Sequence, residues 1–269
     1  MKGIELGKLI GLIEEIAPLS YAEYWDRSGL QLGEGRLLKG SPECFVKRIL
    51  IALELNEAVF AEALNERCDF LLLHHPLFDR TGNYHQRLSK AGILCYAAHT
   101  SFDSAPGGNN DYLALLLGLK NISCFSESGM VGRKGELQKE MTLRELSAHI
   151  KEHLKLETGE LRLAMPEGHE TKTIKRIGLC SGSGTEYAEG AFKEGCEAFI
   201  TGDMKHHQAQ RFLQEGIAVF DAGHYGTEKF FKDNMGSLLT EKLRNAGFEG
   251  DSAPAVIISS AEKNNMIFP

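Results

Sequence analysis

The chain has 269 residues, a net charge of −7 and a pI near 5.8. This length allows one large or two medium domains with a sizeable core. The net negative charge argues against a protein whose main function is to bind nucleic-acid phosphates. Acidic residues near the N-terminus argue against a signal peptide, and no apolar run approaches the length of a membrane span. We therefore expect a cytoplasmic protein with no membrane partner.

The six cysteines are scattered and include no C-x-x-C pair. Four of them, Cys68, Cys95, Cys180 and Cys196, lie in or beside apolar segments. This pattern predicts small core residues in a reducing compartment and excludes a zinc ribbon or a disulfide framework.

Predicted helices and strands alternate along the first half of the chain. Pro18 ends an amphipathic helix, and a glycine-containing loop around Trp25 leads into a strand, with Trp25 interpreted as a core anchor. The further elements are a strand at 48–55, a helix at 56–66, strands at 70–73 and 93–98, and helices near 85–91 and from 109 or 110 to 117. Such alternation predicts a parallel sheet covered on both faces.

An apolar strand, Phe70–Leu73, stops abruptly at His74-His75-Pro76. Pro76 pushes His75 toward an extended backbone, so the two imidazoles leave consecutive residues in divergent directions. This geometry suits two neighbouring metal ions better than one. The pattern is equally consistent with histidines that cap the strand by bonding to backbone carbonyls.

The middle of the chain, about 123–173, carries weaker signals and no cofactor motif. Residues 126–138 contain three glycines and indicate a loop or hairpin. A helix at 141–154 should begin at Thr142, because Glu145 follows three residues later as in a capping box. Residues 160–164 fit a short strand.

The second half repeats features of the first at fixed offsets. Arg48 and Cys68 match Arg176 and Cys196, since 176 − 48 and 196 − 68 both equal 128. The pair His99 and Asp103 matches His224 and Glu228, since 224 − 99 and 228 − 103 both equal 125. We therefore predict two similar α/β units from an internal duplication, with mostly parallel sheets flanked by helices. The expected division is 1–122, a connecting segment at 123–173, and 174–269.

Each half ends an apolar strand with a histidine and places a carboxylate four residues later. Ligands in open α/β sheets gather at the carboxyl ends of the strands, so these groups can converge there. Imidazoles and carboxylates together form a suitable donor set for two divalent ions, which would activate a water molecule. The predicted ligands are His74, His75, Asp103, His224 and Glu228.

Other polar residues have two interpretations. His99 is either a sixth metal ligand or the partner of a ligand. Asp203 or His207 could act as a general acid or base, or could orient a ligand. The alternative for Asp203 is that it caps a helix. His206 is expected to be solvated. The Gly182-Ser-Gly184 turn could cradle a substrate phosphate, although a plain βα turn is favoured because the lysine of a P-loop is missing.

The combined motifs resemble the NIF-three-like dinuclear metal-centre family, which includes YbgI-like and GTP cyclohydrolase type-two-like proteins. The resemblance rests on His-His-Pro, on His99-x-x-x-Asp103, on Thr201-Gly-Asp-Met-Lys-x-His207 and on Gly-His224-x-x-x-Glu228, and Trp25-Asp26-x-Ser28-Gly-Leu fits as well. It implies two α/β domains, a homohexameric toroid, and two ions per subunit held at the five positions above. The ions could be Zn, Fe, Mn, Co or Ni.

The resemblance also implies an activity, namely opening of the imidazole ring of GTP with release of formate. From the residues alone we predict a metal-dependent hydrolase of a small phosphorylated or nucleotide-like substrate. Phosphomonoester or phosphodiester hydrolysis uses the same two-metal logic, and a non-catalytic metal-binding scaffold is a third hypothesis. A hydrolase requires an open coordination position, whereas a structural site is closed by protein ligands.

Overall fold

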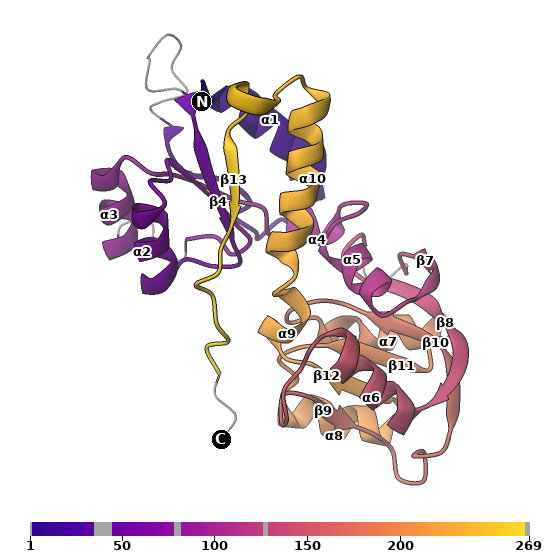
Figure 1. Cartoon of the computed structure of the whole chain (residues 1–269). Helices are drawn as coiled ribbons and strands as arrows, with labels where there is room; N and C mark the ends of the chain where they lie inside the picture. The colour runs from indigo at the N-terminus through magenta and orange to yellow at the C-terminus, as the bar shows by residue number, and fades with distance from the viewer. Residues whose placement is uncertain (1, 35–44, 78–81, 126–128, 267–269) are drawn as a thin grey trace. The chain divides into compact units, whose positions relative to one another are not determined.

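The computed structural model describes residues 2–34, 45–77, 82–125 and 129–266. The chain divides into two compact units: Met1–Gly108 with Phe231–Lys263, and Asn109–Phe230 with Asn264–Pro269. These bounds differ from the expected division. The segment 231–263 belongs to the first unit, and most of the expected connecting segment belongs to the sheet and core of the second. The colours of Figure 1, which follow residue number, show that the first unit contains both N-terminal and C-terminal segments.

The first unit is built on a five-stranded sheet in the order β13-β4-β5-β6-β2. The strands are β2 (Gly29–Leu32), β4 (Arg48–Ala52), β5 (Phe70–Leu73), β6 (Leu94–Ala97) and β13 (Ala255–Ile258), and β1 (Ile4–Glu5) pairs with β3 (Phe45–Val46) beside it. All neighbours in the large sheet are parallel except β2, which runs antiparallel to β6. The fully buried β5 lies at its centre, as its continuous apolar run predicts.

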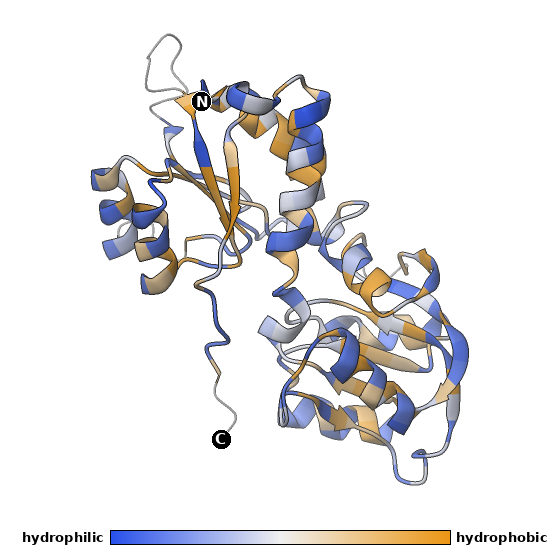
Figure 2. Ribbon diagram, in the orientation of Figure 1, coloured by the Kyte–Doolittle hydropathy of each residue, from blue (hydrophilic) through white to orange (hydrophobic). Residues whose placement is uncertain are grey.

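Helices cover both faces of this sheet (Figure 1). One face is packed against α2 (Glu57–Asn65) and α3 (Asn83–Ala91), and the other against α1 (Leu6–Ile16) and α10 (Phe231–Asn245). Figure 2 shows the apolar strands β4 and β13 between helices with polar outer faces. The short helix α4 (Thr100–Ser104) follows β6. The α/β class predicted from the sequence is confirmed.

The second unit carries a six-stranded sheet in the order β7-β8-β10-β11-β12-β9. Its strands are β7 (Lys120–Ser123), β8 (Arg133–Thr142), β9 (Arg162–Ala164), β10 (Thr173–Leu179), β11 (Ala198–Thr201) and β12 (Val219–Asp221). Only β10, β11 and β12 are parallel neighbours, so this sheet is mixed. The helices are α5 (Asn109–Leu116), α6 (Leu143–His153), α7 (Ala188–Lys193), α8 (His206–Gln214) and α9 (His224–Glu228).

An equivalent carboxylate–amide contact occurs inside each unit, at the offset seen in the sequence. The Asp69 carboxylate accepts hydrogen bonds from the amides of Lys47 and Arg48. In the second unit, Glu197 accepts from the amides of Lys175 and Arg176. Every position is displaced by 128, since 197 − 69, 175 − 47 and 176 − 48 give the same number. These contacts agree with an internal duplication, which itself stays a prediction.

The core contains the predicted thiols. Cys68, Cys95, Cys180 and Cys196 are buried and carry no disulfide, whereas Cys124 is exposed and Cys44 lies outside the described residues. Burial raises the pKa of the Cys68 thiol to about 11, so this thiol is protonated at neutral pH. Among the described residues, no helix has the length and apolar character needed to cross a membrane.

The predicted capping box at the start of α6 is confirmed. Glu145 N donates to Thr142 Oγ1 at 3.2 Å, and Thr142 N donates to the Glu145 carboxylate at 2.7 Å. The Thr142→Ala variant should therefore lose about 1 kcal/mol of unfolding free energy, measured by urea denaturation. Thr142→Ser keeps the hydroxyl and serves as the control. If Ser lost as much as Ala, the cap would not be the cause.

Candidate metal centre

The first group of candidate ligands starts at the end of β5. The amides of His74 and His75 donate to the Leu53 carbonyl at 3.1 and 2.8 Å, which fixes the backbone beyond the strand. His74 is fully buried, and its Nδ1 lies 2.9 Å from the Ala98 carbonyl oxygen. When Nδ1 donates to that oxygen, the neutral ring presents its lone pair at Nε2. Nε2 lies 3.7 Å from Oδ1 of Asp103, a carboxylate that is 6% exposed.

Two further imidazoles adjoin His74. The His74 ring centroid lies 5.2 Å from that of His75 and 5.0 Å from that of His99, and the His75 and His99 centroids are 5.7 Å apart. One ligand atom from each of the three rings can be chosen so that all lie within 4.8 Å of one another. Three imidazoles this close, with one buried carboxylate beside them, form a donor set for a divalent ion.

Carboxylates lie beside Nδ1, here called the outer nitrogen, of two of these rings. His99 Nδ1 lies 2.8 Å from Asp26 Oδ1, and His75 Nδ1 lies 3.4 Å from Glu54 Oε2. A histidine that binds a metal through one nitrogen commonly donates from the other to a carboxylate or a carbonyl, which fixes the orientation of the ring. All three histidines of the first group show this arrangement.

Asp26 is the most tightly bound of these partners. Its carboxylate is 1% exposed and also accepts hydrogen bonds from Ser28 Oγ at 2.6 Å and from the amide and hydroxyl of Thr100. Burial alone would raise the pKa of this carboxyl, but the hydrogen bonds from His99, Ser28 and Thr100 hold the pKa well below its ordinary value. Asp26 is therefore a carboxylate at neutral pH.

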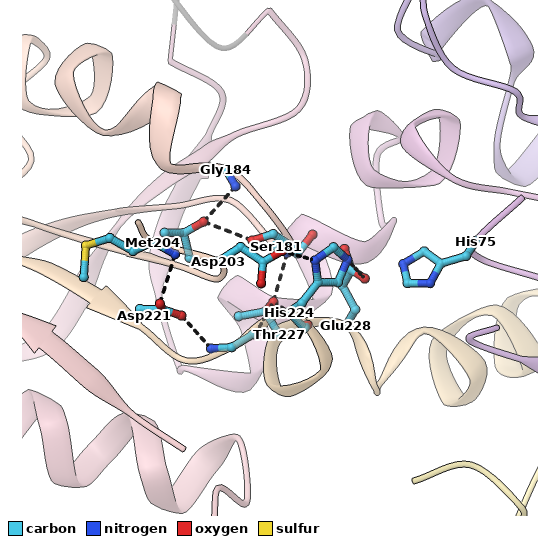
Figure 3. Close-up of polar contacts among 12 residues, drawn as sticks. His75, Ser181, Gly184, Asp203, Met204, Asp221, His224, Thr227 and Glu228 are labelled. Atoms are coloured by element: carbon cyan, nitrogen blue, oxygen red, sulfur yellow. Dashed lines mark hydrogen bonds and ion pairs between the residues drawn. The ribbon is translucent and has the colours of Figure 1, made fainter. Parts of the chain in front are cut away.

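The second group lies on α9, after β12. His224 and Glu228 are four residues apart and so share one face of the helix, with His224 Nε2 3.0 Å from Glu228 Oε2. His224 Nδ1 lies 2.7 Å from Asp203 Oδ2. Both side chains are among the polar contacts drawn in Figure 3. Asp203 thus orients a candidate ligand and does not cap α8, whose N-cap residue is Lys205.

The two carboxylates change the acidity of His224. Burial lowers its pKa, but the negative charges of Glu228 and Asp203 more than offset burial and raise the pKa to about 10. Without metal the imidazole is therefore protonated at neutral pH. Glu228 is 3% exposed, so in this state the imidazolium is the cation that balances a buried carboxylate. A divalent ion would replace that proton.

The loop after β10 supports the second group. The Gly182 amide donates to Thr227 Oγ1 at 2.9 Å, and the Gly184 amide donates to Thr201 Oγ1 at 3.0 Å. A Cβ atom at Gly182 would collide with the Glu228 carboxylate. Both amides are engaged within the protein, so the loop is a close-packed turn and no cradle for a phosphate.

The structure therefore brings the predicted residues together in two groups. His74, His75 and Asp103 lie in the first unit with His99, and His224 and Glu228 lie in the second with Asp203. His206 and His207 are exposed at the start of α8. Sequence reasoning assigned no role to Asp26 or Glu54, although Asp26 stands in the Trp25-Asp26-x-Ser28 motif.

The prediction that Trp25 is a core anchor was wrong. Its side chain is 59% exposed, and the ring meets the His99 ring at an angle of 77° with centroids 6.2 Å apart. The hydrogen bonds of Asp26 to the residues after β6 hold this part of the chain at the edge of the first group, where the indole remains in solvent.

Comparisons with known proteins cover almost the whole chain. Residues 4–264 match the sequence model described as Duf34/NIF3 (NGG1p interacting factor 3). A Clostridium acetobutylicum protein named GTP cyclohydrolase 1 type 2 homolog is 33% identical over 84% of this chain and 85% of its own length. The NGG1-interacting factor 3 of Saccharomyces cerevisiae is 28% identical over 88% and 91%. A crystal structure of a Staphylococcus aureus hypothetical protein superposes with a TM-score of 0.85 at 25% identity, covering 99% of this chain and 100% of the other.

Proposed function

The chain belongs to the Duf34/NIF3 family, and from this premise and the two ligand groups we propose that it is a metal-dependent hydrolase of a nucleotide-like substrate. Two divalent ions per subunit would be held by His74, His75 and Asp103 of the first unit and by His224 and Glu228 of the second. The substrate class follows the name of the bacterial relatives, GTP cyclohydrolase 1 type 2 homolog.

The observation that carries the proposal is the way in which the imidazoles are held. The outer nitrogens of His74, His75, His99 and His224 face the Ala98 carbonyl, Glu54, Asp26 and Asp203, respectively. Histidines that only cap a strand need no such set of carboxylates. Rings oriented by carboxylates are typical of metal ligands, because the outer bond fixes the tautomer and raises the basicity of the inner nitrogen.

The course of the chain supports a role for both groups in one dinuclear centre. Phe231 belongs to the first unit, where its ring packs against that of His74 with centroids 4.9 Å apart. Glu228 precedes Phe231 by only three residues. Three residues span at most about 11 Å, so the covalent chain restricts how far the Glu228 backbone can lie from the first group.

Two such ions would lower the pKa of a water molecule and stabilise negative charge that develops on the substrate. The residues of this chain contribute position and charge. Asp26, Glu54 and Asp203 orient the imidazoles, and Asp103 and Glu228 offset positive charge in a buried setting. A donor set of nitrogen and oxygen accepts Zn, Fe, Mn, Co or Ni.

A second candidate function is a non-catalytic metal-binding scaffold that engages other proteins. The observation that favours it is the name of the yeast relative, NGG1-interacting factor 3. The homohexameric ring implied by the family resemblance would suit either function. Substrate turnover distinguishes the two functions, because a scaffold binds metal without converting a substrate.

Elemental analysis of protein purified without chelators tests the proposal first. We expect about two ions per chain, and turnover of GTP or of generic phosphoesters that depends on added Mn²⁺ or Zn²⁺. His75→Ala should lose metal while keeping its circular dichroism spectrum. Bound metal with no turnover of any of these substrates would favour the scaffold. Hydrolysis of phosphoesters alone would assign a phosphatase. A chain that takes up no metal would refute the site.

A further inference from the structure

Two aromatic side chains occupy the corner of a turn in the first unit. The Asp26 amide donates to the Glu23 carbonyl at 2.9 Å, which places Tyr24 and Trp25 at the two central positions of a hydrogen-bonded turn. Such positions usually hold Gly, Pro, Asn, Asp or Ser. Here Tyr24 is 96% and Trp25 59% exposed. A pair of solvated aromatic rings at this place gains nothing from burial, so its presence calls for another explanation.

Both ends of this turn are attached to the residue that follows His99. The Glu23 amide donates to Thr100 Oγ1 at 2.9 Å, and the Asp26 carboxylate accepts from the Thr100 amide at 3.0 Å. The His99 amide donates in turn to Ser28 Oγ at 3.1 Å. With both ends held, the backbone of Trp25 is already ordered, and a ligand that binds the indole has little conformational entropy to remove.

The indole also stands next to the first ligand group. Its ring lies 6.2 Å from that of His99, which in turn lies 5.0 Å from His74 and 5.7 Å from His75. A substrate held at these imidazoles by its reacting part would have an adjoining planar ring within reach of Trp25.

We infer that Trp25 is a stacking platform for the heteroaromatic base of the substrate. The inference rests on the proposed function, because it needs a substrate that is held at the first ligand group. Every nucleobase has a π face that stacks on an indole, whereas a sugar or phosphate has none. Trp25 therefore assigns the substrate to the base-containing compounds and separates them from simple phosphoesters.

Intrinsic fluorescence gives a direct test, because the chain has a single tryptophan. Zn²⁺-loaded protein is titrated with GTP and, as a probe without a base, with inorganic triphosphate; N-acetyltryptophanamide is titrated in parallel to correct for collisional quenching. We expect saturable quenching by GTP and none by triphosphate. Quenching by GTP that is linear and equal to that of the free indole would overturn the inference.

Calorimetric titration of variants tests whether the ring itself is responsible. Trp25→Ala should weaken GTP binding by about tenfold or more, with unchanged metal content, and Trp25→Phe should retain most of the affinity. Tyr24→Ala is the matched control at the same turn and should bind GTP like the parent. Equal losses in the Tyr24 and Trp25 variants would assign the effect to the shape of the turn and refute a platform.

The results also separate this inference from the proposed function. If turnover depends on metal and Trp25→Ala changes neither KM nor fluorescence-detected binding, the platform is refuted and the hydrolase stands. If Trp25→Ala alters the sedimentation coefficient and leaves GTP binding intact, the indole contacts another copy of the chain and the platform is again refuted. A chain without metal refutes the proposed function, whatever the quenching shows.

Discussion

Replacing Glu228 with glutamine should remove metal from the protein and leave it folded. Glu228 is 3% exposed and 3.0 Å from His224 Nε2, so the change removes an anionic donor while it keeps the shape of the side chain. Even the partners of metal ligands contribute about 10- to 100-fold to metal affinity, and we expect a loss of more than about 100-fold for the ligand itself. Elemental analysis after incubation with Zn²⁺ measures it. Retention of the parent's metal content at limiting Zn²⁺ would contradict the assignment.

The same variant should change the titration of His224 in metal-free protein. In the parent, the charge of Glu228 is the largest contribution that raises the His224 pKa to about 10. Glutamine removes this charge, so the pKa should fall toward its ordinary value of 6.5. An NMR titration of the imidazole protons measures the shift. Asp203→Asn is the control and should lower the pKa less, because Asp203 contributes less than Glu228; equal shifts would be inconsistent with this ranking.

The raised pKa also sets the direction of a pH effect on stability. Because the folded-state pKa lies above the unfolded value, protonated His224 stabilises the metal-free fold fully below pH 6.5, and this contribution is lost as the pH rises toward 10. The metal-free parent should therefore lose more stability than Glu228→Gln between these pH values.

Asp26→Asn should lower the free energy of unfolding by about 3 kcal/mol, since it breaks a buried, hydrogen-bonded charge. The carboxylate is 1% exposed, and an amide group would turn donor hydrogens toward the hydroxyl of Ser28 or the amide of Thr100. Urea denaturation measures the loss. Ser28→Ala is the control: it removes the hydroxyl that donates to Asp26 and accepts from the His99 amide, but it leaves the buried charge in place, so it should cost less, about 1 to 2 kcal/mol.

The pKa of Asp26 predicts how this difference depends on pH. A carboxyl whose pKa is lowered by folding stabilises the fold above its unfolded value, here near 3.8, and the contribution is lost as the pH falls further. The difference in unfolding free energy between the parent and Asp26→Asn should therefore be constant above about pH 5 and decrease below pH 3.8. A gap that stayed constant down to acid unfolding would show that the charge is not its cause.

Local rules in the sequence predicted much of the fold. The helix expected at 56–66 forms as α2, with Asn56 accepting from the Val59 amide, and the apolar run of β5 ends at His74 as expected. His224 and Glu228 are brought together by helical spacing alone, and this four-residue spacing is visible in the sequence. In these cases the determining contacts lie within a few residues of one another.

Contacts between distant residues could not be predicted in this way. Asp26 meets His99 across 73 positions and Asp203 meets His224 across 21, and neither separation follows a helical or strand period. The loop or hairpin expected at 126–138 agrees with the antiparallel pairing of β7 and β8, but the sequence did not indicate that β8 continues to Thr142 and also pairs with β10. Gly135 lies in this strand and packs closely against Leu119. Residues 126–128 lie outside the described part of the chain. Pairing with β7 and β10 thus overrides the low strand propensity of glycine.

The return of the chain to the first unit has a consequence for its synthesis. β13 lies beside β4 in parallel register, with Ala255 opposite Arg48, a separation of 207 residues. The strands and helices of the second unit all fall within one continuous stretch, 109–230. A ribosome delivers residues from the N-terminus onward, so the second unit can complete its sheet while β4 still has an open edge. The first ligand group lies on that later-finished sheet, whose last strand, β13, begins at residue 255 of 269, and such long-range parallel pairing is intrinsically slow.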